Sequence, residues 1–219
     1  MSNATLIIGP SGSGKSTSIR NLNHEETFII NVLNKPLPIK GYKKLYTPLK
    51  KDNAKEGNYF ASDNYQDIIK CVQFVNSSRE DIKTLIIDDW QYVLANEFMR
   101  RARETGFNKF TDISLHGWET INAINATRED LLCFVMSHSE IDSFGKSKCK
   151  TIGKMLDEKI TVEGMFTIVL HSYVIDGEYK FMTQNDGNHI AKSPMGMFDD
   201  IMIGNDLSFV KKSIEDYYE

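Results

Sequence analysis

The sequence has little cysteine, no long apolar run and no basic leader, and each shortage excludes a class of protein. The three cysteines are an odd number without the spacing of a metal site, which is typical of a reduced intracellular protein. No run approaches the roughly 18 apolar residues of a membrane span. Residues 1–4 lack the basic stretch and apolar core of a secretory signal. We therefore predict a cytoplasmic protein without a membrane partner.

Arginine is also scarce, and negative charge is in slight excess. Six arginines occur and none follows Arg128, while acidic residues outnumber Lys and Arg by 30 to 26. The net charge of −4 argues against a protein that binds nucleic acid through its overall charge, but it allows a local basic patch. A content of 41% hydrophobic and 26% charged residues is typical of a globular protein. We expect one α/β domain over residues 1–219.

Apolar runs of strand length alternate along the chain with stretches of helical character. Buried strands are predicted at residues 5–8, 27–32, 84–88 and 131–136, with helices at 16–22, 65–75, 90–104 and 113–128. This alternation predicts a mainly parallel sheet flanked by helices.

The last third of the sequence favours antiparallel strands. Runs rich in β-formers at 166–172 and 178–183 surround Asp176-Gly177, a pair typical of a tight hairpin turn, and a helix is predicted at 207–217. Two smaller features are a helix cap at Ser62 or Asp63 and a short strand near residues 45–46.

A glycine-rich loop follows the first predicted strand. It fits the pattern GxxxxGK[ST] and opens a predicted helix, which is the context that this motif requires. Glycines let backbone N–H groups turn toward phosphates, and the helix N-terminus adds its positive end. Lys15 can reach the β- and γ-phosphates, and the Ser16 hydroxyl can ligate Mg²⁺. The predicted nucleotide-binding residues are Gly9, Pro10, Ser11, Gly12, Ser13, Gly14, Lys15, Ser16 and Thr17.

Two adjacent carboxylates end the third buried strand. Like charges side by side repel each other unless a cation lies nearby. We predict that Asp88 binds Mg²⁺ together with Ser16, as the strand-end acid does in P-loop enzymes. For Asp89 two interpretations stay open: it polarises the attacking water, or it caps the following helix.

His138 comes shortly after the fourth buried strand. In a parallel sheet the carboxyl ends of the strands lie at one edge, where ligands bind, so His138 should lie near Gly9 and Asp88. We predict that it contacts the γ-phosphate or the attacking water and reports the state of the nucleotide.

Residues 139–154 combine four lysines with glycines and serines, which predicts a flexible basic loop. We predict that Lys146, Lys148 and Lys150 contact phosphates of single-stranded DNA. The alternatives are a contact with a neighbouring subunit's nucleotide and a solvated surface loop. Because arginine is absent here, Lys150 and Lys154 are the candidates for the cation that such enzymes often place on the γ-phosphate.

Several motifs together resemble a known family. They are the phosphate loop at 9–17, Leu-Ile-Ile-Asp-Asp at 85–89, Lys-Thr-Ile-Gly-Lys-Met-Leu-Asp at 150–157 and Ala-Lys-Ser-Pro-Met-Gly-Met-Phe at 191–198. Over nearly its whole length the chain resembles the AAA-type, RecA-like ATP-binding proteins of tailed phages. Some of these relatives, the Sak-type proteins, are implicated in single-strand annealing and recombination.

The resemblance implies a RecA-like core that binds ATP with Mg²⁺, single-stranded DNA as a partner, assembly into a ring or filament, and the host cytoplasm as location. RecA-like enzymes usually carry a catalytic glutamate just after the second strand, where this chain has Asn31-Val-Leu-Asn34. The residues expected to take part in hydrolysis are Lys15, Asp88, Asp89, His138 and Lys154.

Two other classes of function stay open. A nucleotide kinase would need arginines on a lid over the phosphates, and residues 139–154 contain none. An AAA+ loader or assembly switch would need a helical lid with an arginine after the core, where a hairpin is predicted instead. A DNA recombination or annealing ATPase is the preferred interpretation.

Overall fold

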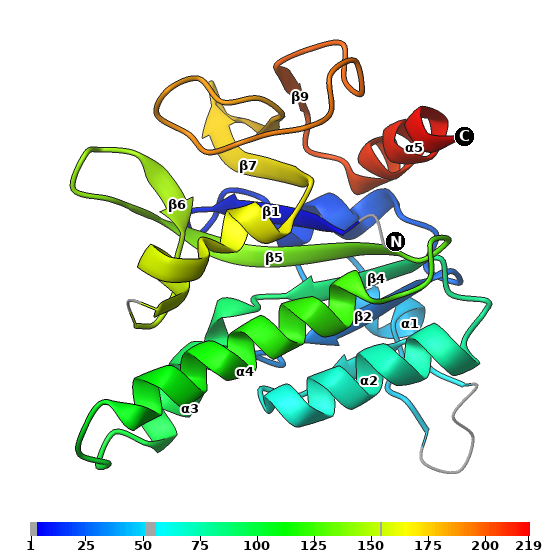
Figure 1. Ribbon diagram of the computed structural model, residues 1–219. Coiled ribbons are helices and arrows are strands. Elements are labelled where there is room, and N and C mark those ends of the chain that lie inside the picture. The colour runs from blue at the N-terminus through cyan, green and yellow to red at the C-terminus, as the bar shows by residue number, and fades with distance from the viewer. Residues whose placement is uncertain (1–3, 51–55, 154) are drawn as a thin grey trace.

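The computed structural model describes residues 4–50, 56–153 and 155–219, and within them the strands form a nine-stranded sheet. Its order is β3-β2-β4-β5-β1-β7-β8-β9, and β6 pairs with β5 outside this order (Figure 1). The strands are β1 (Thr5–Gly9), β2 (Thr27–Asn31), β3 (Tyr59–Ala61), β4 (Thr84–Asp88), β5 (Leu132–Ile141), β6 (Ser147–Cys149), β7 (Ile168–Ile175), β8 (Glu178–Met182) and β9 (Met202–Gly204).

The centre of the sheet is parallel, as predicted. Strands β3, β2, β4, β5, β1 and β7 all run in the same direction. Their carboxyl ends therefore meet at one edge, where Gly9 lies opposite His138 and Asn31 lies opposite Asp88. Strand β5 separates the strand before the phosphate loop from the strand that ends in Asp88.

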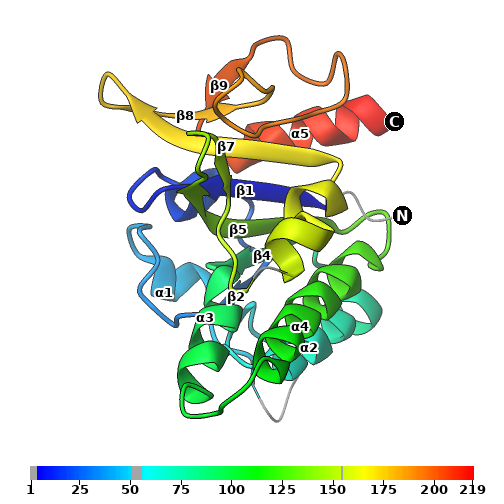
Figure 2. The same ribbon diagram turned by 60° about the vertical axis from the view of Figure 1, so that its left-hand side comes forward.

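Helices cover both faces of this sheet (Figures 1 and 2). Successive strand residues point to opposite faces, so Ile29 packs in one core while Phe28 and Ile30 pack in the other. Helices α2, α3 and α4 cover the face of Phe28, and η1, α1 and α5 cover the face of Ile29. The helical segments are η1 (Ser16–Asn21), α1 (Tyr42–Leu45), α2 (Tyr65–Ser78), α3 (Gln91–Arg100), α4 (Asn108–Asn125), η2 (Met155–Ile160), η3 (Val162–Met165) and α5 (Leu207–Tyr218).

The predicted C-terminal hairpin is confirmed. Strands β7 and β8 pair antiparallel, and β9 adds a further antiparallel strand. Asp176 and Gly177 have φ angles of 50° and 79°, the left-handed values that a tight two-residue turn requires. The hairpin extends the parallel core on the side of β1.

Three local predictions were wrong in detail. The short strand expected at residues 45–46 is the end of helix α1, where the Tyr46 backbone N–H donates to Tyr42 O at 2.7 Å. The helix predicted after the phosphate loop is a 3₁₀ helix. The N-cap of α2 is Asn64, whose side chain accepts hydrogen bonds from two backbone N–H groups. Asp63 does not cap the helix; its carboxylate accepts hydrogen bonds from Asn96 and Arg100, both at 2.7 Å.

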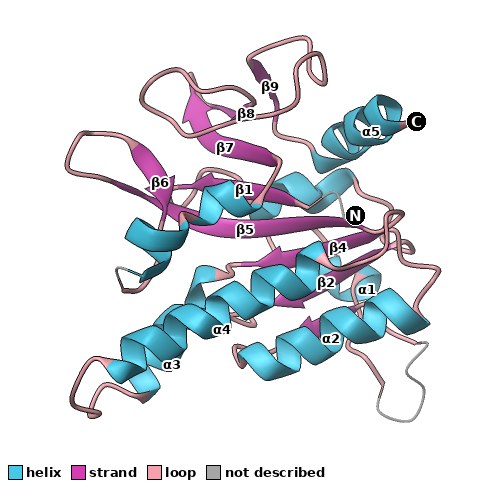
Figure 3. Ribbon diagram, in the orientation of Figure 1, coloured by secondary structure: helices cyan, strands magenta, loops and turns pink. Residues whose placement is uncertain are grey.

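Residues 139–149 form a β-ribbon, so the prediction of a flexible loop was wrong for this part. Strand β5 continues to Ile141 and pairs antiparallel with β6 in a ribbon that projects from the sheet (Figure 3). The Asp142 carboxylate accepts the backbone N–H groups of Phe144 and Lys146, each at 2.8 Å, and Gly145 adopts a φ of 81°. The turn that closes the ribbon is therefore stabilised by the Asp142 side chain, which binds its backbone amides, and by Gly145, which adopts the left-handed conformation.

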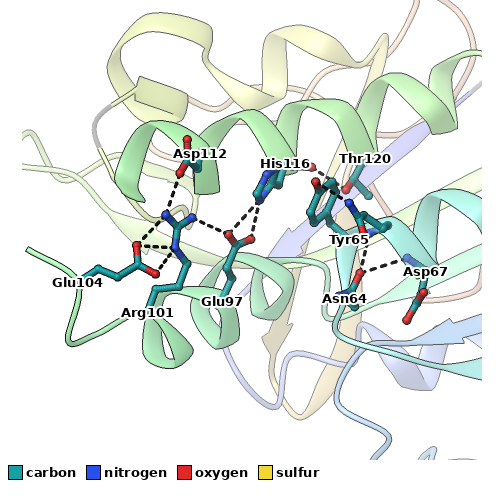
Figure 4. Close-up of polar contacts among 10 residues, drawn as sticks. Asn64, Tyr65, Asp67, Glu97, Arg101, Glu104, Asp112, His116 and Thr120 are labelled. Carbon is teal, nitrogen blue, oxygen red and sulfur yellow. Dashed lines mark hydrogen bonds and ion pairs between the residues drawn. The ribbon is translucent and has the colours of Figure 1, made fainter. Parts of the chain in front are cut away.

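A polar network joins the helices on the face of Phe28 (Figure 4). Arg101, the residue that follows α3, contacts Glu97, Glu104 and Asp112, the last of which lies on α4. His116 on α4 bonds to Glu97 at 2.8 Å and stacks on Tyr65 of α2, with ring centroids 3.7 Å apart. The network holds α3 against its neighbours, and Trp90 alone separates the start of α3 from Asp88 and Asp89.

All three cysteines are buried, and none of them forms a disulfide. Among the residues that the structure describes, no helix combines the length and the apolar character needed to cross a bilayer.

His171 on β7 should make the fold less stable in mild acid. It is 3% exposed, its Nε2 lies 2.9 Å from Ser147 Oγ, and burial lowers its pKa from 6.5 to about 4, with a further contribution from neighbouring His189. The unfolded chain therefore takes up a proton between about pH 6.5 and pH 4 that the folded chain does not. As the pH is lowered from about 6.5 to about 4, the free energy of unfolding should therefore fall by about 1 to 3 kcal/mol because of His171.

Chemical denaturation of the protein and of the His171→Gln variant between pH 4 and pH 7.5 measures this contribution. The carboxylates titrate in both proteins, so the difference between the two curves isolates the histidine. Curves of equal slope would show that His171 does not cause the loss.

Candidate nucleotide site

The phosphate loop joins the end of β1 to helix η1. Gly12 and Gly14 have φ angles of 78° and 94°, which side chains rarely adopt. A Cβ on Gly14 would also lie 2.6 Å from a ring carbon of Tyr179, and Ser172 Oγ donates to Ser13 O at 2.6 Å. The loop is thus held against β7 and β8 in a shape that its glycines permit.

Lys15 lies within this loop rather than in solvent. Its Nζ donates to Gly9 O and to Pro10 O, both at 2.8 Å, and the residue is 6% exposed. Burial lowers the pKa of Lys15 to about 8, although the negative charges of Asp89 and Asp88 oppose this effect. The ammonium stays charged at neutral pH, and one of its three N–H donors is left for a phosphate oxygen.

Ser16 and Asp88 lie together, as predicted for a magnesium site. The Ser16 hydroxyl donates to Asp88 Oδ1 at 2.9 Å. Asp88 is fully buried, and its Oδ2 has no hydrogen-bond partner within the described part of the chain. Burial raises the pKa of Asp88 to about 6, and the neighbouring Asp89 adds to the effect. A hydroxyl and a carboxylate with a free buried oxygen fit Mg²⁺, which prefers oxygen ligands and takes the rest from phosphate and water.

The side chain of Asp89 faces the site and does not cap the next helix. The N-cap of α3 is Trp90, without a side-chain cap, so the capping alternative does not hold. Asp89 has a φ of 65° and is 1% exposed, and its carboxylate forms an ion pair with Lys35. Burial acts to raise the pKa of Asp89, but hydrogen bonds with His138 and Lys35 outweigh burial and lower it.

His138 lies beside Asp89, at the edge of the sheet where it was expected. Its Nε2 is 3.6 Å from Asp89 Oδ1. Its backbone N–H donates to Gln91 Oε1 at 2.9 Å, and its ring meets that of Tyr92 edge-on at 5.9 Å. His138 is therefore positioned by α3, the same helix that follows the two aspartates.

Residues 11–17 of the phosphate loop, Asp89 and His138 line one pocket of about 270 Å³, and Asp88 contacts it through Ser16. Besides the phosphate loop, Asp89 and His138, four residues that the sequence analysis did not select line it. They are Lys35, Pro36, Pro38 and Tyr179. Lys35 could have been considered because it follows a predicted parallel strand at the ligand-binding edge. For Tyr179 the sequence offers no comparable indication.

Two of the predicted DNA-binding lysines, Lys146 and Lys148, lie on the β5–β6 ribbon, and Lys150 directly follows it. Lys146 and Lys150 are exposed, whereas Lys148 forms ion pairs with Asp157 and, at 3.4 Å, with Glu140. Lys154 lies outside the described residues, so its assignment stays a prediction. Among the described residues, Lys35 is the lysine that lines the pocket from outside the phosphate loop.

A parallel sheet with a phosphate loop after β1 and a buried acid at the end of β4 defines a P-loop NTPase. The family model of the AAA domain matches residues 1–195, and the chain belongs to this family. No curated protein matches the chain significantly.

Proposed function

We propose that the protein is a Mg²⁺-dependent ATPase that acts on single-stranded DNA in recombination or annealing, the processes in which the Sak-type proteins of tailed phages are implicated. The observation that carries the ATPase part is the Ser16–Asp88 pair beside the phosphate loop, with Asp89 and His138 on the same pocket. Assembly into a ring or filament belongs to the same proposal.

The proposal assigns roles to the phosphate loop with Lys15, and to Ser16, Asp88, Asp89 and His138. Lys15 and the loop amides bind the β- and γ-phosphates, while Ser16 and Asp88 hold Mg²⁺. The metal, when bound, offsets the phosphate charge. Asp89 accepts a hydrogen bond from the attacking water, and His138 lies within reach of the same region.

Asp89→Asn tests the hydrolytic role directly. Loss of the carboxylate should slow phosphate release about a hundredfold, the typical contribution of a general base, while nucleotide binding persists. Phosphate release and binding of a fluorescent nucleotide should be measured on the same preparations. An unchanged rate would remove Asp89 from the mechanism.

An assembly switch is the second candidate, and one observation favours it. Asn31 is buried and lies opposite Asp88, at the end of the strand after which RecA-like enzymes usually carry their glutamate. If the protein uses ATP only to assemble, turnover should be very slow with or without DNA. Gel filtration should then show a change of assembly size on nucleotide binding alone.

The ribbon supports the DNA part of the proposal. Phe144 at its tip is 86% exposed and can stack on a base, and Lys146 is exposed close to it in the chain. Lys150 is exposed at the other end of the ribbon, where its backbone N–H donates to His138 O at 2.8 Å. Replacing both lysines by alanine should lower the slope of log affinity against log salt by about 0.7 for each lysine. The loss should be equal for all sequences, since phosphate contacts carry no base information.

Fluorescence anisotropy with labelled single strands at several salt concentrations measures this slope. Lys211→Ala and Lys212→Ala, on helix α5, are matched controls for charge. An unchanged slope in the ribbon variant would place DNA binding elsewhere or remove it from the proposal.

A further inference from the structure

Lys35 reaches into the nucleotide pocket from the segment that follows β2. Its side chain is 44% exposed, yet it pairs with the Asp89 carboxylate, whose side chain is only 2% exposed. It lines the same pocket as Lys15, Ser16 and His138. An exposed lysine that meets a buried acid inside a phosphate-binding pocket needs an explanation beyond surface solvation.

The backbone at Lys35 is anchored to the sheet edge. The buried Asn31 side chain donates to Lys35 O at 2.8 Å, and the Asn34 backbone N–H donates to Asn31 O at 3.3 Å. Pro36 follows directly and restricts the backbone of Lys35 to extended conformations. The backbone of Lys35 is therefore fixed, while its flexible four-carbon side chain lets the ammonium reach more than one nearby acceptor.

The pocket needs a second cation for a triphosphate. Two of the three Lys15 donors go to Gly9 O and Pro10 O, which leaves one for phosphate. Among the described residues that line the pocket, Lys35 is the other cation. A γ-phosphate carries more charge than one carboxylate and offers more acceptor oxygens, so it competes with Asp89 for this ammonium.

We propose that the Lys35 ammonium exchanges its ion-pair partner when a nucleoside triphosphate binds, leaving Asp89 for the γ-phosphate. This exchange frees the Asp89 carboxylate for the attacking water. The inference rests on the proposed ATPase function and names the cation of that site. Lys35 acts from the same chain as the phosphate loop. A nucleoside diphosphate has no γ-phosphate, so it leaves the Lys35–Asp89 pair intact.

Binding of ADP and of a non-hydrolysable ATP analogue, both with Mg²⁺, tests the exchange. Lys35→Met keeps the apolar stem and removes the charge. It should weaken binding of the triphosphate analogue about 10- to 100-fold, the range of a charge-assisted hydrogen bond, and change ADP binding less than about threefold. Lys40→Met, an exposed lysine on the same segment, is the matched control and should change neither affinity.

Asp89→Asn tests the other half of the exchange. Without the competing carboxylate, Lys35 is free for the γ-phosphate, so affinity for the triphosphate analogue should rise several-fold while ADP binding stays constant. In the double variant Lys35→Met/Asp89→Asn this gain should vanish. A gain that persists without Lys35 would overturn the exchange.

The outcomes separate this inference from the proposed function. If Lys35→Met binds ADP and the triphosphate analogue as tightly as the unmodified protein does, Lys35 is a structural partner of Asp89 and the inference is wrong, while nucleotide binding stands. If the unmodified protein binds neither nucleotide, the proposed function itself fails, and the inference fails with it.

Discussion

Lys15→Ala should reduce ATP hydrolysis about 100- to 1,000-fold, the range seen when one preorganised donor to a developing charge is removed. The Lys15 ammonium is held by Gly9 O and Pro10 O at the base of the loop, where the remaining donor faces the pocket. Affinity for ATP should fall about 10- to 100-fold, because a charge-assisted hydrogen bond is lost. The fold should persist, since burial already lowers the pKa of Lys15 to about 8 and so disfavours its charge in the folded state.

Phosphate release, nucleotide binding and thermal unfolding of the same variant check these three expectations. Lys43→Ala, an exposed lysine on α1, is the matched control and should behave as the unmodified protein. Full turnover by Lys15→Ala would mean that hydrolysis takes place at another site. A variant that does not fold would instead show that Lys15 has a structural role, and Lys15→Arg would then separate charge from packing.

Asp88→Asn should reduce Mg²⁺-dependent hydrolysis by at least about a hundredfold without loss of stability. The amide keeps the shape of the side chain and an oxygen that can accept the Ser16 hydroxyl, but it removes the charge that would hold the metal. Burial raises the pKa of Asp88 from 3.8 to about 6, so its ionisation lowers the stability of the folded protein as the pH rises from about 4 to about 6, and the loss is complete at pH 7. The variant should therefore be at least as stable as the unmodified protein at pH 7, and any gain should disappear near pH 4.

A titration of phosphate release against Mg²⁺, together with unfolding curves at pH 4 and pH 7, measures both effects. Asp130→Asn is a suitable control, because Asp130 pairs with Lys83 on the surface, at 2.6 Å. Turnover that keeps the same Mg²⁺ dependence in Asp88→Asn would exclude Asp88 as a metal ligand. Lower stability at pH 7 would contradict the argument from burial.

Substitution of Lys15 and substitution of Lys35 should change nucleotide affinity in different ways. Lys15 contacts the loop that binds both nucleotides, so its loss should weaken ADP and ATP alike, whereas loss of Lys35 should affect the triphosphate alone. The comparison separates general phosphate binding from recognition of the γ-phosphate.

The central strands and the phosphate loop could be predicted from the sequence alone. Runs such as residues 85–87 consist of consecutive apolar residues because both faces of a parallel strand are covered, and this pattern is local in the chain. The loop from Gly9 to Thr17 is also local, since glycine conformation and the start of a helix depend on adjacent residues. The position of Asp88 near the phosphate loop could also be predicted, because parallel strands present their carboxyl ends at one edge of the sheet.

Contacts between distant segments were decided by the tertiary structure. The Lys35–Asp89 pair joins residues from the ends of two different strands, and Tyr179 reaches Gly14 only because the C-terminal hairpin folds back beside β1. Residues 139–149 were predicted to be a flexible loop because serine, glycine and lysine are common in loops. In the structure they form a ribbon, because β6 pairs with the extension of β5. The sequence by itself determined the central parallel strands and the phosphate-loop motif, because those features depend on neighbours in the chain. The folded sheet decided which side chains complete the pocket, because only strand order brings residues 35, 89, 138 and 179 to the same edge.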